Sequence, residues 1–111
     1  MNFDDAIVAH MRWKFRLTDY IEGKSIEKLD AKVVCRDDAC DLGKWIKGSP
    51  TSPELENLRQ AHAVFHAQAG SVVEAFDAKR AEEARTILEG SYLKASSAVI
   101  FLIRQMGEKA A

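Results

Sequence analysis

The sequence predicts an all-α protein, a helical bundle of about four main helices with one short helix that carries a cysteine. Two observations predict this class. Apolar residues recur every three or four positions along three long stretches, as they do in amphipathic helices. No strand pattern occurs outside an ambiguous segment at 31–36. At 111 residues the chain is long enough to bury a core as a single domain, 1–111, without disulfides.

The first long helix is expected to begin after Asn2 or Asp4, to run to about Glu22 and to stop at Gly23. Its core side is an apolar stripe with one histidine in the middle: Phe3, Ala6, Ile7, His10, Trp13, Leu17 and either Tyr20 or Ile21. The segment 24–36 fits either a short helix or an ordered loop packed over the end of the bundle.

A short helix follows, with Asp37 or Asp38 as its N-cap and Gly48 at its end. It carries Ala39, Cys40, Leu42, Trp45 and Ile46. The stretch 48–53 is a loop, and its last residues form a helix start, with Ser52 as N-cap and Pro53 at the first helical position.

The helix that starts at Pro53 keeps its apolar stripe as far as Phe76. The favoured turn is 77–79, although the composition would equally permit a continuous helix. A charged helix begins at about Arg80, and Gly90–Ser91 breaks or bends it. The last helix carries Tyr92, Ala95, Val99, Leu102, Ile103 and Met106.

Charge and hydropathy exclude several classes of partner. Lys and Arg number 16 and Asp and Glu number 17, so the net charge of −1 gives no basic surface for nucleic acid or anionic membrane. The N-terminal residues 1–5 are acidic and lack the pattern of a signal peptide. The late apolar run, 98–103, is too short to span a bilayer. We therefore expect a cytoplasmic protein with no membrane or nucleic-acid partner.

All three histidines fall on predicted apolar stripes, and His62 and His66 are one helical turn apart. A single core histidine is usually structural and bonded to a backbone carbonyl. Three together, two of them at ligand spacing, favour a metal site. One thiolate, from Cys40 or Cys35, completes a four-coordinate shell of three imidazoles and one sulfur. This donor set suits zinc in tetrahedral geometry.

Cys40 is the favoured sulfur ligand, because Leu42 and Trp45 on the same short helix would turn inward with it. Cys35 stands next to the charged Arg36 and is not expected to be a ligand. The alternative is a pair of ordinary thiols, or a disulfide between them, which a reducing compartment disfavours.

Other metal chemistries fit less well. Zinc proteases with a His-x-x-x-His pair need a glutamate after the first histidine, and here that residue is Ala63. A shell of four protein ligands leaves no open position for a reactive water, so no catalytic residue is expected. The Glu-x-x-His motifs of di-iron bundles are absent from the sequence. Haem held by paired histidines stays an alternative, although the Cys-x-x-Cys-His signature is absent.

The motifs together resemble a known family. His10 followed by Trp13, the run Cys40-Asp41-Leu42-Gly43-Lys44-Trp45, and His62-Ala63-Val64-Phe65-His66 resemble the chemoreceptor zinc-binding domain. This domain occurs in bacterial soluble chemoreceptors, diguanylate cyclases and some stand-alone proteins. The resemblance extends from the first helix to the last. It implies a helical bundle that commonly dimerises and zinc ligands at His10, Cys40, His62 and His66.

The resemblance implies a regulatory role, in which zinc occupancy or oxidation of the ligand cysteine alters an attached signalling output. Hypochlorite-type oxidants are the expected reagents, and Cys35 is a candidate resolving thiol. The sequence contains no signalling coiled coil or cyclase domain, so the output is expected either from another protein or from a region outside this sequence. The runner-up is a purely structural zinc-stabilised dimerisation bundle. The run 99–103 on the last helix offers apolar surface for a homodimer.

Overall fold

Six helices form an elongated bundle in the computed structural model of the protein, which describes residues 1–110. The bundle measures 43 × 22 × 21 Å. In chain order the helices are α1 (Phe3–Ile21), α2 (Ala31–Val34), α3 (Asp41–Gly48), α4 (Pro53–Asp77), α5 (Ala81–Glu89) and α6 (Ser91–Ala110). No strand occurs within 1–110, so the predicted all-α class is confirmed. The segment 24–36, for which the sequence permitted two structures, contains the short helix α2.

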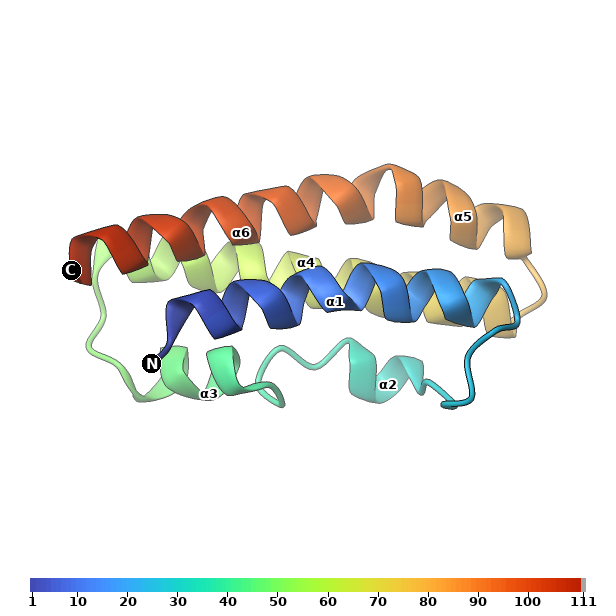
Figure 1. Cartoon of the computed structure of the whole chain (residues 1–111), viewed down its shortest axis with the longest axis horizontal. Coiled ribbons are helices and arrows are strands. Elements are labelled where there is room, and N and C mark those ends of the chain that lie inside the picture. The colour runs from blue at the N-terminus through green and yellow to red at the C-terminus, as the bar shows by residue number, and fades with distance from the viewer. Residues whose placement is uncertain (111) are drawn as a thin grey trace.

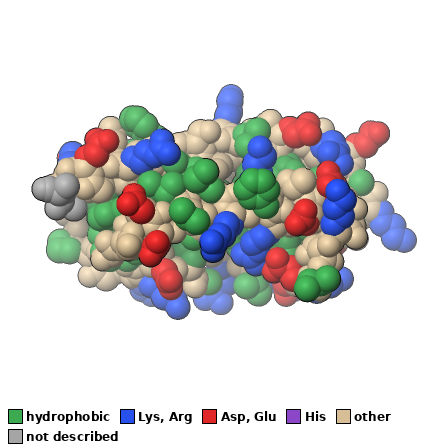
Figure 2. Space-filling view, viewed as in Figure 1, with side chains coloured by type: hydrophobic (Ala, Val, Ile, Leu, Met, Phe, Trp, Pro, Cys, Tyr) green, Lys and Arg blue, Asp and Glu red, His purple; other side chains and the backbone are tan. Residues whose placement is uncertain are grey.

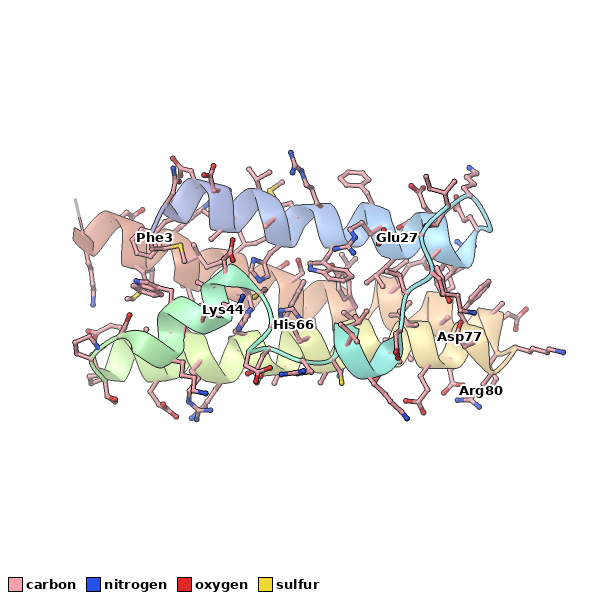
Figure 3. All side chains as sticks on the ribbon, turned by 90° about the horizontal axis from the view of Figure 1, so that it is seen from below. Phe3, Glu27, Lys44, His66, Asp77 and Arg80 are labelled. Atoms are coloured by element: carbon pink, nitrogen blue, oxygen red, sulfur yellow. The ribbon has the colours of Figure 1, made fainter. Side chains whose placement is uncertain are left out.

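The long helices lie side by side along one axis (Figure 1). Helices α1 and α4 run in the same direction, and α5 and α6 return along them as one bent rod. The segment with α2 and α3 covers the remaining side of the bundle, in front of and between α1 and α4 (Figure 3). This segment therefore faces the two helices that carry the three histidines.

Two of the predicted helix starts are confirmed by their capping hydrogen bonds. The Asn2 side-chain oxygen accepts from the Asp5 backbone N–H at 3.0 Å, and the Ser52 hydroxyl accepts from the Leu55 backbone N–H at 3.1 Å. Pro53 occupies the first turn of α4, as predicted.

The predicted N-cap of the third helix is wrong. Cys40 caps α3, and neither Asp37 nor Asp38 does. The Asp38 carboxylate instead pairs with the Arg36 guanidinium, at 3.1 Å, and the chain turns before the helix begins. The cysteine is thereby placed at the start of α3 and not inside it.

The second half of the chain follows the prediction closely. Helix α4 ends at Asp77, one residue later than predicted, and Lys79 makes the turn with a left-handed φ of 66°. The break at Gly90–Ser91 separates α5 from α6. The core joins all the long helices through fully buried side chains that include Leu17, Leu58, Phe65, Val72, Tyr92, Val99 and Ile103.

The stretch Ala81–Lys109, which covers α5 and most of α6, is long and apolar enough to cross a membrane by length and composition. This is weak support for a membrane span, because the core helix of a soluble protein passes the same test. Helix α6 packs against α4 and α1, and Val99 and Ile103 are completely buried there.

Candidate metal centre

Four side chains from three parts of the chain meet in the core of the bundle. His10 comes from the middle of α1, Cys40 from the start of α3, and His62 and His66 from successive turns of α4. One nitrogen or sulfur atom from each lies within 4.8 Å of the others. The three histidines are 3%, 1% and 2% exposed in that order, and Cys40 is half-buried. Figure 3 shows His66 near the segment that joins α2 to α3.

The His62 Nε2 atom lies close to each of the other three donor atoms. It lies 3.2 Å from the Cys40 Sγ, 3.2 Å from the His10 Nε2 and 3.1 Å from the His66 Nε2. The Cys40 Sγ is also 3.6 Å from the His66 Nε2. Three Nε2 atoms and one sulfur therefore face a single point.

Backbone carbonyls fix the orientation of two of the rings. The His10 Nδ1 lies 2.7 Å from the Ala6 carbonyl oxygen, and the His66 Nδ1 lies 3.0 Å from the Val34 carbonyl oxygen. A carbonyl oxygen only accepts hydrogen bonds, so in a neutral ring the proton is on Nδ1. The Nε2 lone pairs of His10 and His66 are then free for a metal ion, as in many metal-ligating histidines.

Burial keeps the imidazoles neutral at physiological pH. It is the main cause of a lowered pKa for His10 and His66 and brings the pKa of His62 to about 3. The neighbouring imidazoles lower the pKa of His62 further. A metal-ligating histidine must be neutral. The three rings are therefore in the protonation state that a metal requires.

The Cys40 sulfur receives support from the start of α3. The Gly43 backbone N–H lies 3.4 Å from the sulfur and points to it. Burial raises the pKa of the Cys40 thiol, and the backbone N–H groups of Gly43 and Leu42 oppose that rise. The N-terminus of a helix stabilises a thiolate in the same way.

Glycine is required at position 43 by the close approach of another backbone segment. A Cβ atom there would lie 1.7 Å from the Asp37 carbonyl oxygen and 2.8 Å from its carbon. The chain at 37–38 therefore folds directly over the first turn of α3. This contact explains the glycine in the run Cys40-Asp41-Leu42-Gly43-Lys44-Trp45.

The cluster fits a tetrahedral zinc ion. Zinc–nitrogen bonds of about 2.0–2.1 Å and a zinc–sulfur bond of about 2.3 Å make tetrahedron edges of about 3.3 Å between nitrogens and about 3.6 Å from nitrogen to sulfur. Four of the six edges are 3.1 and 3.2 Å between nitrogens and 3.2 and 3.6 Å to the sulfur, and all six lie within 4.8 Å. The two Nε2 lone pairs of His10 and His66, packed close to the His62 Nε2 and the Cys40 sulfur, are groups that a shared cation would satisfy.

The four residues selected from the sequence are thus brought together, and Cys35 is not among them. Cys35 is exposed at the end of α2, where its thiol lies 3.4 Å from the Lys32 carbonyl oxygen. Both cysteines are free. The Val34 carbonyl, which is the partner of His66, has no signal in the sequence, because no side-chain pattern marks a backbone acceptor.

A buried cluster of three imidazoles and one thiol in an all-α bundle defines the class of protein: a helical domain built around a four-ligand metal centre. The family model of the chemoreceptor zinc-binding domain matches residues 10–73, which is more than half of the chain. The chain belongs to this family, and its cofactor is zinc. No curated protein sequence and no solved structure matches the chain.

The match begins at His10 and ends in α4, so it spans all four cluster residues and leaves out α5 and α6. The resemblance seen in the sequence extended over nearly the whole chain, and the family match is shorter. The family is regulatory rather than catalytic, and its members typically occur in signalling proteins.

Proposed function

We propose that the chain is a single zinc-binding regulatory domain, 1–111, with His10, Cys40, His62 and His66 as the zinc ligands. It responds to zinc occupancy and passes the change to a bacterial signalling partner of the chemoreceptor or diguanylate cyclase type. The observation that carries the proposal is the convergence of four ligand atoms from α1, α3 and α4 within 4.8 Å. The closed donor set leaves no position for a reactive water, and we propose no catalytic activity.

The ligands connect parts of the chain that share few other contacts. Bound zinc would supply a positive charge that four donor atoms share. Helix α3 is short and packs mainly on α4, so Cys40 is its main polar connection to His62 and His66. Part of the free energy of zinc binding then goes into ordering α3 against α1 and α4. Metal loss would loosen this junction, which is the change that a partner would detect.

Metal analysis of the purified protein tests the ligand assignment. Wild-type protein is expected to carry one zinc ion per chain, and Cys40→Ala and His62→Ala are expected to lose most of it. Cys35→Ala is the matched control, because this thiol lies outside the cluster. Equal zinc in wild type, Cys40→Ala and His62→Ala would refute the assignment.

We further propose that Cys40 responds to hypochlorite-type oxidants. Surface clefts of about 350 and 650 Å³ both reach Cys40, and Cys40 is the only one of the four cluster residues that is not fully buried. The thiolate sulfur attacks the chlorine of hypochlorous acid, an S–Cl bond forms, and the Cl–O bond breaks with hydroxide as the leaving group. Water then displaces chloride from the sulfur and loses a proton, and the product is a sulfenic acid. The sulfenic acid has lost the thiolate charge and holds zinc less tightly.

A hypochlorite titration with a chromogenic zinc indicator tests this step. Release of zinc at about one equivalent of oxidant is expected, and recovery after thiol reduction should follow. Cys35→Ala should release zinc equally well, and slower recovery in that variant would identify Cys35 as the resolving thiol. Retention of zinc in excess oxidant would favour the structural dimerisation bundle, the second candidate, in which burial of the three histidines serves stability alone.

We also propose that the domain forms a homodimer in the cytoplasm, without a membrane or nucleic-acid partner. Of the run 99–103, which the sequence offered as dimer surface, only Phe101 is exposed, because Val99 and Ile103 are buried in the core. The exposed side chains Val8, Met11 and Phe15 follow one face of neighbouring α1. Figure 2 shows hydrophobic side chains on this face between charged ones. Light scattering should give twice the 12.4 kDa chain mass, and Phe15→Lys should give a monomer. A monomeric wild type would refute the dimer.

A further inference from the structure

Helix α2 packs directly onto the backbone of α4 at Gly70. Gly70 lies one turn after His66 on the same face of α4. A Cβ atom at this position would lie 2.7 Å from the Cys35 Cβ, and 3.3 Å from both the Cys35 Cα and the Ala31 carbonyl oxygen. The absent side chain is therefore what permits the present distance between the two helices.

The same short helix provides the hydrogen-bond acceptor for His66. The Val34 carbonyl oxygen lies 3.0 Å from the His66 Nδ1, and the Val34 side chain is buried in the core. Residues Ala31, Val34 and Cys35 belong to one helical turn and its cap. They move together if α2 is displaced. The contact at Gly70 and the hydrogen bond at His66 are thus two parts of one packing interface.

We propose that Gly70 is a positioning residue for the metal centre. By admitting α2 close to α4, it keeps the Val34 carbonyl on the His66 Nδ1–H and so holds the His66 Nε2 lone pair toward the cluster. The zinc-affinity part of this proposal rests on the proposed function. The orientation and tautomer of His66 are properties of the metal-free chain.

An alanine at position 70 cannot be accommodated by a side-chain rotation alone. Two of its three nearest neighbours would be backbone atoms, and the third, the Cys35 Cβ, is bonded directly to the backbone and cannot rotate away. Restoring ordinary contact at that Cβ requires a shift of about 1 Å. The same shift in α2 takes the 3.0 Å bond at His66 beyond the length of a hydrogen bond.

The test compares wild type, Gly70→Ala, Gly48→Ala and the double variant Gly70→Ala/Cys35→Gly. Gly48 is a helical glycine with open space around its Cβ position, so it controls for the substitution itself. Cys35→Gly removes the atom that the new methyl group would meet. The double variant should therefore restore the packing in large part, and it carries the test if Gly70→Ala alone fails to fold.

The first measurement is the ¹⁵N spectrum of the imidazole rings in metal-free protein. Wild type and Gly48→Ala should show His66 with its proton on Nδ1, Gly70→Ala should show a tautomer mixture, and the double variant should recover the wild-type signals. The proposal is overturned if wild-type His66 carries its proton on Nε2. It is overturned equally if Gly70→Ala keeps the wild-type spectrum, or if the folded double variant does not recover it.

The second measurement is zinc affinity by competition with a chelator. Loss of the hydrogen-bond partner of a metal-ligating histidine typically weakens binding by 10–100-fold. We expect a decrease of about 10-fold in Gly70→Ala, no change in Gly48→Ala and recovery in the double variant. Wild-type affinity in Gly70→Ala overturns the proposal. If wild type itself binds no zinc, the proposed function fails, and the ¹⁵N spectra still decide the role of Gly70.

Discussion

Replacement of Gly43 by alanine tests whether the site depends on the close packing at the start of α3. The new Cβ would lie 1.7 Å from the Asp37 carbonyl oxygen. Ordinary contact needs about 3.4 Å, so the chain at 37–38 or the first turn of α3 must move by about 1.5 Å or more. Either movement shifts Cys40, which lies between the two segments.

The expected cost follows from two opposing effects. Forcing a methyl group into filled space costs about 1–3 kcal/mol, while alanine in place of glycine in a helix contributes about 1 kcal/mol in the opposite direction. The overlap here is with backbone and is severe, so we expect Gly43→Ala to lose about 1–2 kcal/mol of unfolding free energy. Gly48→Ala, in open space on the same helix, should gain up to about 1 kcal/mol.

Denaturant unfolding of the two variants in metal-free and zinc-loaded form gives the unfolding free energy of each variant and its stabilisation by zinc. Zinc stabilises the folded chain according to its affinity. The stabilisation by zinc should therefore be smaller in Gly43→Ala and unchanged in Gly48→Ala. A Gly43→Ala protein as stable as Gly48→Ala, with full stabilisation by zinc, would refute the packing explanation of the motif glycine.

Three further predictions concern residues away from the cluster. Lys79 has a left-handed φ of 66°, so Lys79→Gly should raise the unfolding free energy by about 1 kcal/mol, and a loss of stability would contradict this. The buried Tyr92 hydroxyl has no hydrogen-bond partner among the described residues, so Tyr92→Phe should be neutral or raise the thermal midpoint. The hydrogen bond to Asp77 raises the pKa of Tyr20 to about 12. The folded state then holds this proton more tightly than the unfolded state, so the stabilisation is complete below pH 10 and is lost between about pH 10 and 12. Tyr20→Phe should reduce the loss of stability in this pH range. A pH profile of stability equal to that of wild type would contradict the role given to Tyr20.

The sequence predicted the elements whose local signals agree with their packing. The first helix is an example: Asn2 caps it, and its stripe faces the core as the spacing indicated, with Phe3 and Trp13 partly buried and the rest buried. Ser52 and Pro53 likewise marked the start of α4 correctly. In these helices the cap and the hydrophobic period indicate the same boundaries, so single-sequence reasoning was sufficient.

The segment between the long helices could not be predicted to the same depth. Asp37 and Asp38 are better N-caps than cysteine by propensity, yet Cys40 caps α3 because the chain at 37–38 packs over Gly43. The four-residue α2 is too short to show a hydrophobic period, and it packs closely onto α4 at Gly70. Such tertiary contacts leave little trace in a local pattern. The apolar stripes of the helices predicted which residues of the cluster face inward, whereas nothing in the sequence predicted the backbone acceptor of His66.

X-ray absorption at the zinc edge of the purified, zinc-loaded protein tests the central claim most directly. The shell built from His10, Cys40, His62 and His66 predicts one sulfur at about 2.3 Å, three nitrogens at about 2.0–2.1 Å and the multiple-scattering pattern of imidazole. Cys40→Ala should remove the sulfur contribution, and Cys35→Ala should leave the spectrum unchanged. A wild-type shell with two sulfurs, with none, or with fewer than three imidazoles would contradict the assignment of these four residues.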